Sequence, residues 1–169
     1  MNDPANQRKR VIVWDDPNAL LQGASTMTGL EAMQAIQAGK LPHPPIAALM
    51  DIRMTDVSEG RVVCEMDPGE YQCNPLGTVH GGALTTLMDS SMSCAVHSML
   101  PAGTGYATLD VTANFVRPVR SGTGSLRCEG TVLHFGSRTA TAQCQVTDPA
   151  GVLCAHGTVT CMILRPDRR

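Results

Sequence analysis

Hydrophobic and polar residues alternate through much of the last third of the chain. Between Tyr106 and Phe115 the odd-numbered residues are apolar, and Arg138 to Val146 shows a similar alternation. An unbroken period of two is typical of strands, whose side chains point alternately to opposite faces. Apolar residues also share one face between Leu126 and Val132, and a last apolar run, Val152 to Leu164, follows the turn-forming residues 148–151. The region therefore predicts four consecutive antiparallel strands.

A different pattern occupies residues 83–100, which contain neither Gly nor Pro. The run is too long for an ordinary strand and predicts a helix of about five turns. Two short strands precede it, at Ile52–Thr55 and Arg61–Met66. This order of strands, one long helix and further strands predicts an α+β fold, with an antiparallel sheet of about five to six strands around one central helix.

The first 45 residues have a different character. They are polar and rich in proline, and they contain one short amphipathic helix, Gly29–Ala38, with Thr28 as its N-cap and Glu31 three residues later. Three prolines then separate this helix from the strands. We therefore predict an N-terminal extension over residues 1–45 and a folded domain over residues 46–166.

Composition excludes several kinds of partner. A chain of 169 residues with a net charge of -2 has no electrostatic feature that favours nucleic acid or an anionic membrane. No apolar run approaches the roughly 20 residues of a membrane span. The seven cysteines are scattered and show no C-x-x-C, so we expect buried thiols in a soluble cytoplasmic protein, and no metal site.

A polar stripe interrupts the apolar surface of the predicted long helix. Thr85, Asp89, Ser93 and His97 recur every four residues and share one face. A solvent-exposed edge would explain such a stripe, but the segment from His80 to Leu100 contains no Lys, Arg or Glu, which solvent faces usually carry. We therefore expect Asp89 to be partly buried, with a raised pKa that suits a catalytic base.

The start of this helix offers a second functional group. In His80-Gly81-Gly82, two residues without side chains stand where backbone N–H groups have no intrahelical partner and can stabilise an oxyanion. Asp89 follows Gly82 by seven residues, about 10 Å of helical rise, which is too far for both to contact one atom. We therefore predict a composite site, in which the turn of one subunit faces Asp89 of another.

The run from Asn74 to Asp89, NPLGTVHGGALTTLMD, resembles the hotdog-fold acyl-CoA thioesterases, specifically the PaaI-like group named for phenylacetate degradation. The resemblance extends over residues 46–166, because Asn114–Pro118 and Gly136–Ala140 also match the family pattern. It implies the hotdog fold and hydrolysis of an acyl-CoA to a free acid and CoA. It also implies a homodimer with sheets joined edge to edge, or a dimer of dimers, and no cofactor, since CoA is part of the substrate.

The resemblance also assigns catalytic roles. Asp89 corresponds to the catalytic carboxylate, acting as nucleophile or as general base on water, and the Gly81 amide would hold the thioester carbonyl. Asn74 would orient water or that carbonyl. His80 is included in the site, although we expect it to shape the turn rather than to transfer protons.

The substrate-binding residues are assigned less directly. Gly82 lies beside the proposed oxyanion donor, and Ser93 or Thr108 would supply a hydroxyl near Asp89. Arg138, like Arg117 and Arg120, lies near a strand end where a CoA phosphate could bind, but each could equally be a surface charge.

Two alternatives to a thioesterase remain. A hotdog hydratase or dehydratase also handles acyl thioesters but uses a differently placed His with an acidic partner, and the spacing of His80 and Asp89 fits it less well. A non-catalytic acyl-CoA binding module would keep the pocket and lose the carboxylate, so the presence of Asp89 argues against it. A Ser-His-Asp hydrolase is disfavoured because no G-x-S-x-G occurs.

Overall fold

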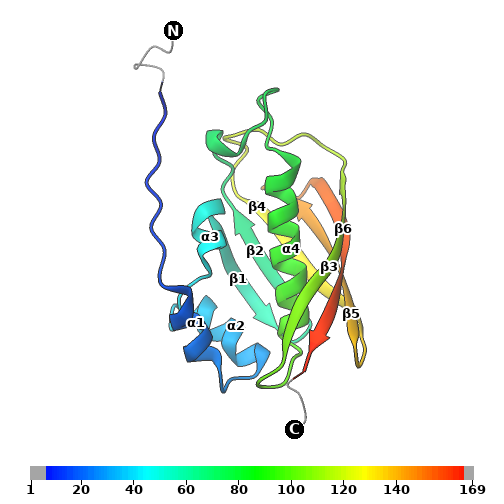
Figure 1. Cartoon of the computed structure of the whole chain (residues 1–169). Coiled ribbons are helices and arrows are strands. Elements are labelled where there is room, and N and C mark those ends of the chain that lie inside the picture. Colours follow the sequence, from blue (N-terminus) through cyan, green and yellow to red (C-terminus); the bar gives the residue numbers. More distant parts are fainter. Residues whose placement is uncertain (1–6, 166–169) are drawn as a thin grey trace.

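The computed structural model describes residues 7–165, and within them six strands form one antiparallel sheet around a central helix (Figure 1). The strand order is β1-β2-β4-β5-β6-β3, and the helix is α4 (Gly81–His97). The predicted α+β architecture is thus confirmed. The strands are β1 (Ile52–Ser58), β2 (Arg61–Met66), β3 (Gly105–Phe115), β4 (Leu126–Phe135), β5 (Thr139–Thr147) and β6 (Leu153–Leu164).

The shorter helices precede α4. The predicted N-terminal helix is α2 (Gly29–Gln37), and Thr28 and Glu31 form both hydrogen bonds of its capping box. The sequence pattern did not predict α1 (Pro17–Ala24), which has only eight residues and contains a proline and a glycine that read as breaks. It also missed α3 (Pro45–Met50) and the 3-10 turn Glu70–Gln72, which are too short to show a helical period.

The core lies between α4 and the inner face of the sheet. Leu87, Met88 and Met92 of α4 are completely buried. Because the chain has few aromatic residues, aliphatic and sulfur-containing side chains such as these build the core. The helix approaches the sheet closely at Gly130 of β4, where a Cβ atom would lie 2.4 Å from the carbonyl oxygen of Ser91. A side chain at Gly130 would push α4 away from β4.

The boundaries of α4 differ from those predicted. It begins two residues earlier, at Gly81, because His80 caps it and both glycines belong to its first turn. It ends at His97 rather than at residue 100, and the residues that follow form a turn.

The unbroken alternation predicted for residues 106–115 is wrong. A β-bulge leaves Leu109 without a partner, because Thr108 pairs with Cys161 and Asp110 with the adjacent Thr160. Even-numbered residues therefore face α4 before the bulge and odd-numbered residues face it afterwards. This change of phase lets Thr108 contact α4, while Val111 packs against the core farther along the strand.

The two edges of the sheet are covered differently. Helices α2 and α3 pack against β1, whereas β3 has no strand on its outer side within residues 7–165.

No helix in this described range is long and apolar enough to cross a membrane. The division of the chain at residue 45 stays a prediction, and its outer limits, residues 1–6 and 166, lie outside the described residues.

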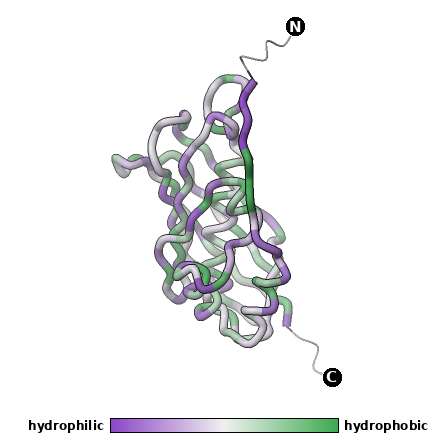
Figure 2. The backbone as a smooth tube through the Cα atoms, turned by 90° about the vertical axis from the view of Figure 1, so that its left-hand side faces the viewer, coloured by the Kyte–Doolittle hydropathy of each residue, from purple (hydrophilic) through white to green (hydrophobic). Residues whose placement is uncertain are grey.

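The segment 7–16 runs in an extended form along one side of the molecule, hydrophilic at first and then hydrophobic (Figure 2). Arg10 holds it there. The Arg10 guanidinium donates to the Leu49 carbonyl oxygen at 2.8 Å, pairs with Asp51 at 2.6 Å and stacks 3.9 Å from the centre of the Tyr71 ring. These contacts attach the extended segment beside α3.

Candidate active site

The turn at the start of α4 exposes one backbone donor. His80 is the N-cap of the helix, and its Nδ1 accepts a hydrogen bond from the Gly82 N–H at 2.8 Å. The preceding N–H, that of Gly81, has no acceptor within residues 7–165. Because the helix dipole adds positive potential at this end, the Gly81 N–H is suited to bind a developing negative charge.

The packing around the turn is tight at residues 81 and 82. A Cβ atom there would lie 3.1 Å from the Phe115 ring, which is the last residue of β3. At Gly82 a Cβ atom would lie 3.0 Å from the His80 imidazole. The two glycines therefore allow the aromatic ring and the imidazole to pack against the turn without moving it.

A pocket of about 320 Å³ opens beside the turn and brings Asn74 close to Gly81. The Asn74 side chain also supports its own loop: its Nδ2 donates to the Thr78 hydroxyl at 2.9 Å, and its Oδ1 accepts from the Leu76 N–H at 2.9 Å. An amide group has two N–H donors, so the second one can face the pocket. Arg117 also lines this pocket.

The half-buried carboxylate of Asp89 lies two turns farther along α4. The Thr108 hydroxyl donates to its Oδ1 at 3.1 Å across the contact between α4 and β3. Burial raises the pKa of the Asp89 carboxyl above its ordinary value, and the Thr108 hydrogen bond opposes this rise. No basic side chain contributes to the shift, in agreement with the absence of Lys and Arg from this stretch of helix. The carboxylate is therefore partly desolvated and suited to accept a proton or attack a carbonyl carbon.

Ser93 and Tyr106 form the next contact along the same line. The Ser93 hydroxyl donates to the backbone carbonyl of Asp89 at 2.6 Å, and the Tyr106 hydroxyl contacts the Ser93 oxygen at 3.3 Å. Of the two hydroxyls expected near Asp89, that of Thr108 thus contacts the carboxylate, and that of Ser93 does not. Sequence reasoning missed Tyr106, although an aromatic residue on the otherwise polar side of the strand pattern was a usable signal.

The turn and the carboxylate are separate within one chain. Asp89 does not line the pocket at Gly81, and it follows Gly81 by eight residues, which corresponds to about 12 Å of helical rise. A single thioester carbonyl cannot contact both groups of one chain. The two candidate groups therefore lie apart within one chain.

Comparison with known proteins identifies the family. The model of the thioesterase superfamily matches residues 76–155, which contain the glycine turn, Asp89 and Thr108. The chain is 30% identical over 135 residues to 1,4-dihydroxy-2-naphthoyl-CoA hydrolase of Escherichia coli, an alignment that covers 80% of this chain and 94% of that protein. This chain belongs to the thioesterase superfamily. The human acyl-coenzyme A thioesterase 13 is 29% identical over 110 residues, covering 64% of this chain and 77% of that protein.

Solved structures of thioesterase-superfamily proteins share the fold. A phenylacetic acid degradation-related protein from Ralstonia eutropha JMP134 superimposes with a TM-score of 0.71 and 25% identity, covering 77% of this chain and 98% of that one. The Escherichia coli PaaI protein superimposes with a TM-score of 0.69 and 20% identity, covering 85% of this chain and 96% of that one. The hotdog fold and the resemblance to PaaI-like thioesterases are thereby confirmed.

The structure does not bring Arg138 to the glycine turn of this thioesterase. Arg138 is exposed before β5, and its carbonyl accepts a hydrogen bond from the Ile163 N–H at 2.9 Å. Ile163 pairs with Tyr106, which lies beside the C-terminal half of α4. Arg117, in contrast, shares a pocket with Asn74 and Gly81. A role for Arg138 in CoA binding stays a prediction.

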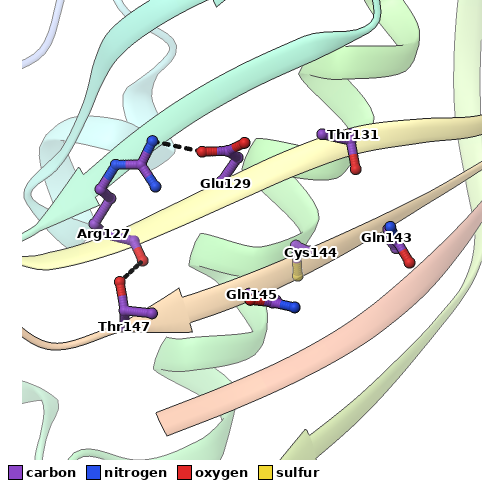
Figure 3. A pocket seen from close by; sticks show the side chains of 7 residues that line it. All are labelled: Arg127, Glu129, Thr131, Gln143, Cys144, Gln145 and Thr147. Atoms are coloured by element: carbon purple, nitrogen blue, oxygen red, sulfur yellow. Dashed lines mark hydrogen bonds and ion pairs between the residues drawn. The ribbon is translucent and has the colours of Figure 1, made fainter. Parts of the chain in front are cut away.

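A separate hollow of about 280 Å³ lies on the face of the sheet that points away from α4 (Figure 3). Its carboxylate, Glu129, pairs with Arg127 at 2.5 Å and with Arg61 at 3.0 Å. Hydrogen bonds from these two guanidinium groups lower the pKa of Glu129 to about 2. A carboxylate held in the charged form by two cations is a weak base, so this hollow does not compete with Asp89 as a candidate site.

Groups that could hold a metal ion are absent from the described part of the chain. Its seven cysteines are all free thiols, five of them buried. Burial raises the pKa of the Cys64 thiol to about 11, which keeps it protonated and unreactive at neutral pH.

Proposed function

We propose that this thioesterase hydrolyses an acyl-CoA to a free acid and CoA, at a site formed by two copies of the chain. The observation that carries the proposal is the half-buried Asp89 carboxylate, which is desolvated, contacts Thr108 and has no basic side chain as a partner in the described structure. Two relatives support the substrate class, since both the Escherichia coli and the human protein are named for CoA thioesters.

The chemistry divides between the two groups. The Gly81 N–H donates a hydrogen bond to the thioester oxygen as this becomes an oxyanion. Asp89 takes a proton from water, whose oxygen adds to the carbonyl carbon, and collapse of the tetrahedral intermediate breaks the C–S bond and releases CoA as a thiolate, which gains the proton. In the alternative route the Asp89 carboxylate itself adds, expels the thiolate and forms an anhydride that water then hydrolyses.

A dimer would bring the two groups together. The outer edge of β3 offers unpaired backbone groups over 11 residues, and an open edge of this length is a site for pairing with another chain. The exposed apolar side chains of Leu109 and Phe115 on this strand would be covered in the same step. Pairing of two β3 strands about a twofold axis would place α4 of each chain beside the other, with opposite directions. A dimer of dimers is compatible with the same pairing.

The remaining site residues keep secondary roles in this proposal. Asn74 donates its second amide hydrogen to the reacting carbonyl or to water, Gly82 allows close approach, and His80 holds the turn. Ser93 supports the backbone beneath Asp89. The free thiols of the chain are compatible with a reducing compartment, and we therefore assign the protein to the cytoplasm.

The direct test measures release of free thiol from a panel of acyl-CoA substrates. Asp89→Asn is expected to lower kcat at least about 10²-fold, the scale for loss of a catalytic base. Glu59→Gln, which neutralises an exposed carboxylate between β1 and β2, serves as the control and is expected to retain full activity. Equal rates for wild type and Asp89→Asn would refute the role of Asp89. Wild-type binding without turnover of any thioester would favour the binding module.

The composite site has its own test. Asp89→Asn and Gly81→Ala chains, each weakly active alone, are produced together so that mixed dimers form. A mixed dimer contains one site with both groups intact, so the mixture is expected to recover about one quarter of the wild-type activity. A mixture no more active than its components would show that each site belongs to a single chain.

A further inference from the structure

An apolar cleft of about 430 Å³ lies at the other end of α4, lined by residues of α1, α2 and the start of β3. Figure 1 shows these three elements near the C-terminal end of α4. Its walls are largely aliphatic side chains and methionines, and none of the residues that line it is Asp, Glu, Lys or Arg. Burial lowers the pKa of His97 and raises the pKa of Tyr106, so both polar rings in the wall are uncharged near neutral pH. The cleft is therefore suited to an uncharged, apolar group.

The cleft lies close to the candidate carboxylate along the boundary between α4 and β3. A line of contacts follows the boundary between α4 and β3: Thr108 to Asp89 at 3.1 Å, Tyr106 to Ser93 at 3.3 Å, and the Tyr106 ring to that of His97 with centroids 5.4 Å apart. Both Tyr106 and His97 line the cleft. The polar contacts at Asp89 thus lead directly to an apolar space.

The walls of the cleft differ in how firmly they are held. Helix α2 is docked on the end of α4, because the Gly29 N–H donates to the Leu100 carbonyl at 2.9 Å and a Cβ atom at Gly29 would lie 1.7 Å from the His97 carbonyl oxygen. Helix α1 buries no residue and contributes Leu20 and Ala24 to the outer wall. The outer wall is therefore the part that can vary without loss of the fold.

We propose that this cleft, the acyl chamber, binds the distal part of the acyl group of the substrate, and that α1 limits the length of that group. The inference rests on the proposed thioesterase function. Tyr106 in the chamber wall precedes Thr108 on β3 by two residues, or about 7 Å of strand rise, and Thr108 contacts Asp89. An extended chain advances about 1.2 Å per bond, so roughly six atoms separate the reacting carbon from the chamber.

The size and chemistry of the chamber indicate which part of the substrate it takes. A cavity of about 150 Å³ holds one benzene molecule, so 430 Å³ accommodates a medium-chain alkyl group or an aryl group. Met27, Met33 and Met54 in the wall can adjust to either shape. The phosphates of CoA have no cation to bind there, so the nucleotide must lie elsewhere.

Two matched substitutions in α1 test the chamber. Ala24→Phe places an aromatic ring in it, whereas Ala19→Phe makes the same change on the exposed side of the same helix. With butyryl-, octanoyl- and dodecanoyl-CoA, Ala24→Phe is expected to lower kcat/KM at least about 10-fold for the two longer substrates and to leave butyryl-CoA unchanged. Ala19→Phe is expected to match wild type on all three. Met27→Ala, which widens the chamber, should raise the dodecanoyl-to-octanoyl ratio.

A binding measurement separates this inference from the proposed activity. Thioether analogues of the same three acyl-CoAs cannot be hydrolysed, and calorimetry is expected to show wild-type affinity rising about threefold or more per methylene beyond the sixth carbon. If Ala24→Phe loses this gain in affinity with chain length and Ala19→Phe keeps it, the chamber is supported, whether or not wild type hydrolyses any substrate. Absence of hydrolysis by wild type would refute only the proposed function. The opposite result is that hydrolysis depends on Asp89 but Ala24→Phe and Ala19→Phe show the same chain-length preference. That result would overturn the chamber and support the proposed function.

Discussion

The two candidate regions of α4 are built in different ways. At its start the candidate oxyanion donor is the Gly81 N–H, in a turn that is capped by His80 and packed closely against the Phe115 ring. Two turns later the candidate base is the Asp89 side chain, half-buried and contacted by one hydroxyl from β3. The position of a backbone donor depends on the packing around the turn, while the properties of a carboxylate depend on the polarity of its surroundings. The first region should therefore respond to changes in volume and the second to changes in polarity.

Apart from loss of the Asp89 carboxylate itself, the largest effect is expected at the turn. Gly81→Ala should lower kcat about 10²-fold, because the new methyl group meets the Phe115 ring at 3.1 Å and displaces the oxyanion donor. The double variant Gly81→Ala with Phe115→Leu should recover at least about 10-fold of the lost rate, since the smaller side chain relieves the contact.

Glu59→Gln, the exposed control used for Asp89, is expected to keep the wild-type kcat in the same assay. Failure of the double variant to recover would show that the substrate, rather than the ring, occupies the space beside Gly81.

A pH profile distinguishes the carboxylate region from the turn. The Thr108 hydrogen bond lowers the pKa of Asp89, so Thr108→Val should raise that pKa and move the acidic limb of kcat/KM to higher pH. We expect about a 10-fold loss at the acidic end of the profile and a smaller loss at pH 8. Thr112→Val, an exposed threonine beyond the bulge, should leave the profile unchanged. A uniform loss at every pH would indicate a purely structural role for Thr108.

Stability measurements test the cap of the turn. His80→Ala removes the acceptor for the Gly82 N–H and should cost about 1 kcal/mol, equivalent to about 2–4 °C in Tm for a chain of this size. His80→Asn keeps a side-chain acceptor and should retain both stability and most of the activity. Loss of activity in His80→Asn at wild-type Tm would instead assign proton transfer to the imidazole.

The smallest effect is expected on the melting temperature when the partly buried charge of Asp89 is removed. Because the folded-state pKa of Asp89 is raised above its unfolded value of about 3.9, the folded state binds the proton more tightly, and stability falls as the pH rises through the folded pKa. Asp89→Asn avoids this loss. Its Tm should exceed that of wild type by about 2 °C at pH 8, and the difference should vanish near pH 3.5. A lower Tm at pH 8 would contradict desolvation as the cause of the shift.

The fold could be predicted because strong periodic patterns coincide with its main elements. The 17-residue α4 and the strands of the last third differ from the expected bounds by only a few residues. The bulge at Leu109 could not be predicted in the same way. A single extra residue changes which side chains face the helix, and it is determined by pairing with β6 rather than by the local sequence of β3. Tyr106 was overlooked for this reason.

The sequence by itself determined the α+β order of elements, the glycine turn, the partial burial of Asp89 and the seven-residue spacing that separates Gly82 from Asp89 by about 10 Å. These properties depend on helical geometry and on the absence of charged neighbours, which are local. Only the tertiary structure decided that His80 accepts from Gly82, that Thr108 is the hydroxyl beside Asp89, and that the N-terminal helices border an apolar cleft. Those contacts join different segments of the chain. The distance between the segments and the direction of their side chains follow from strand pairing and packing, which the local hydrophobic pattern does not reveal.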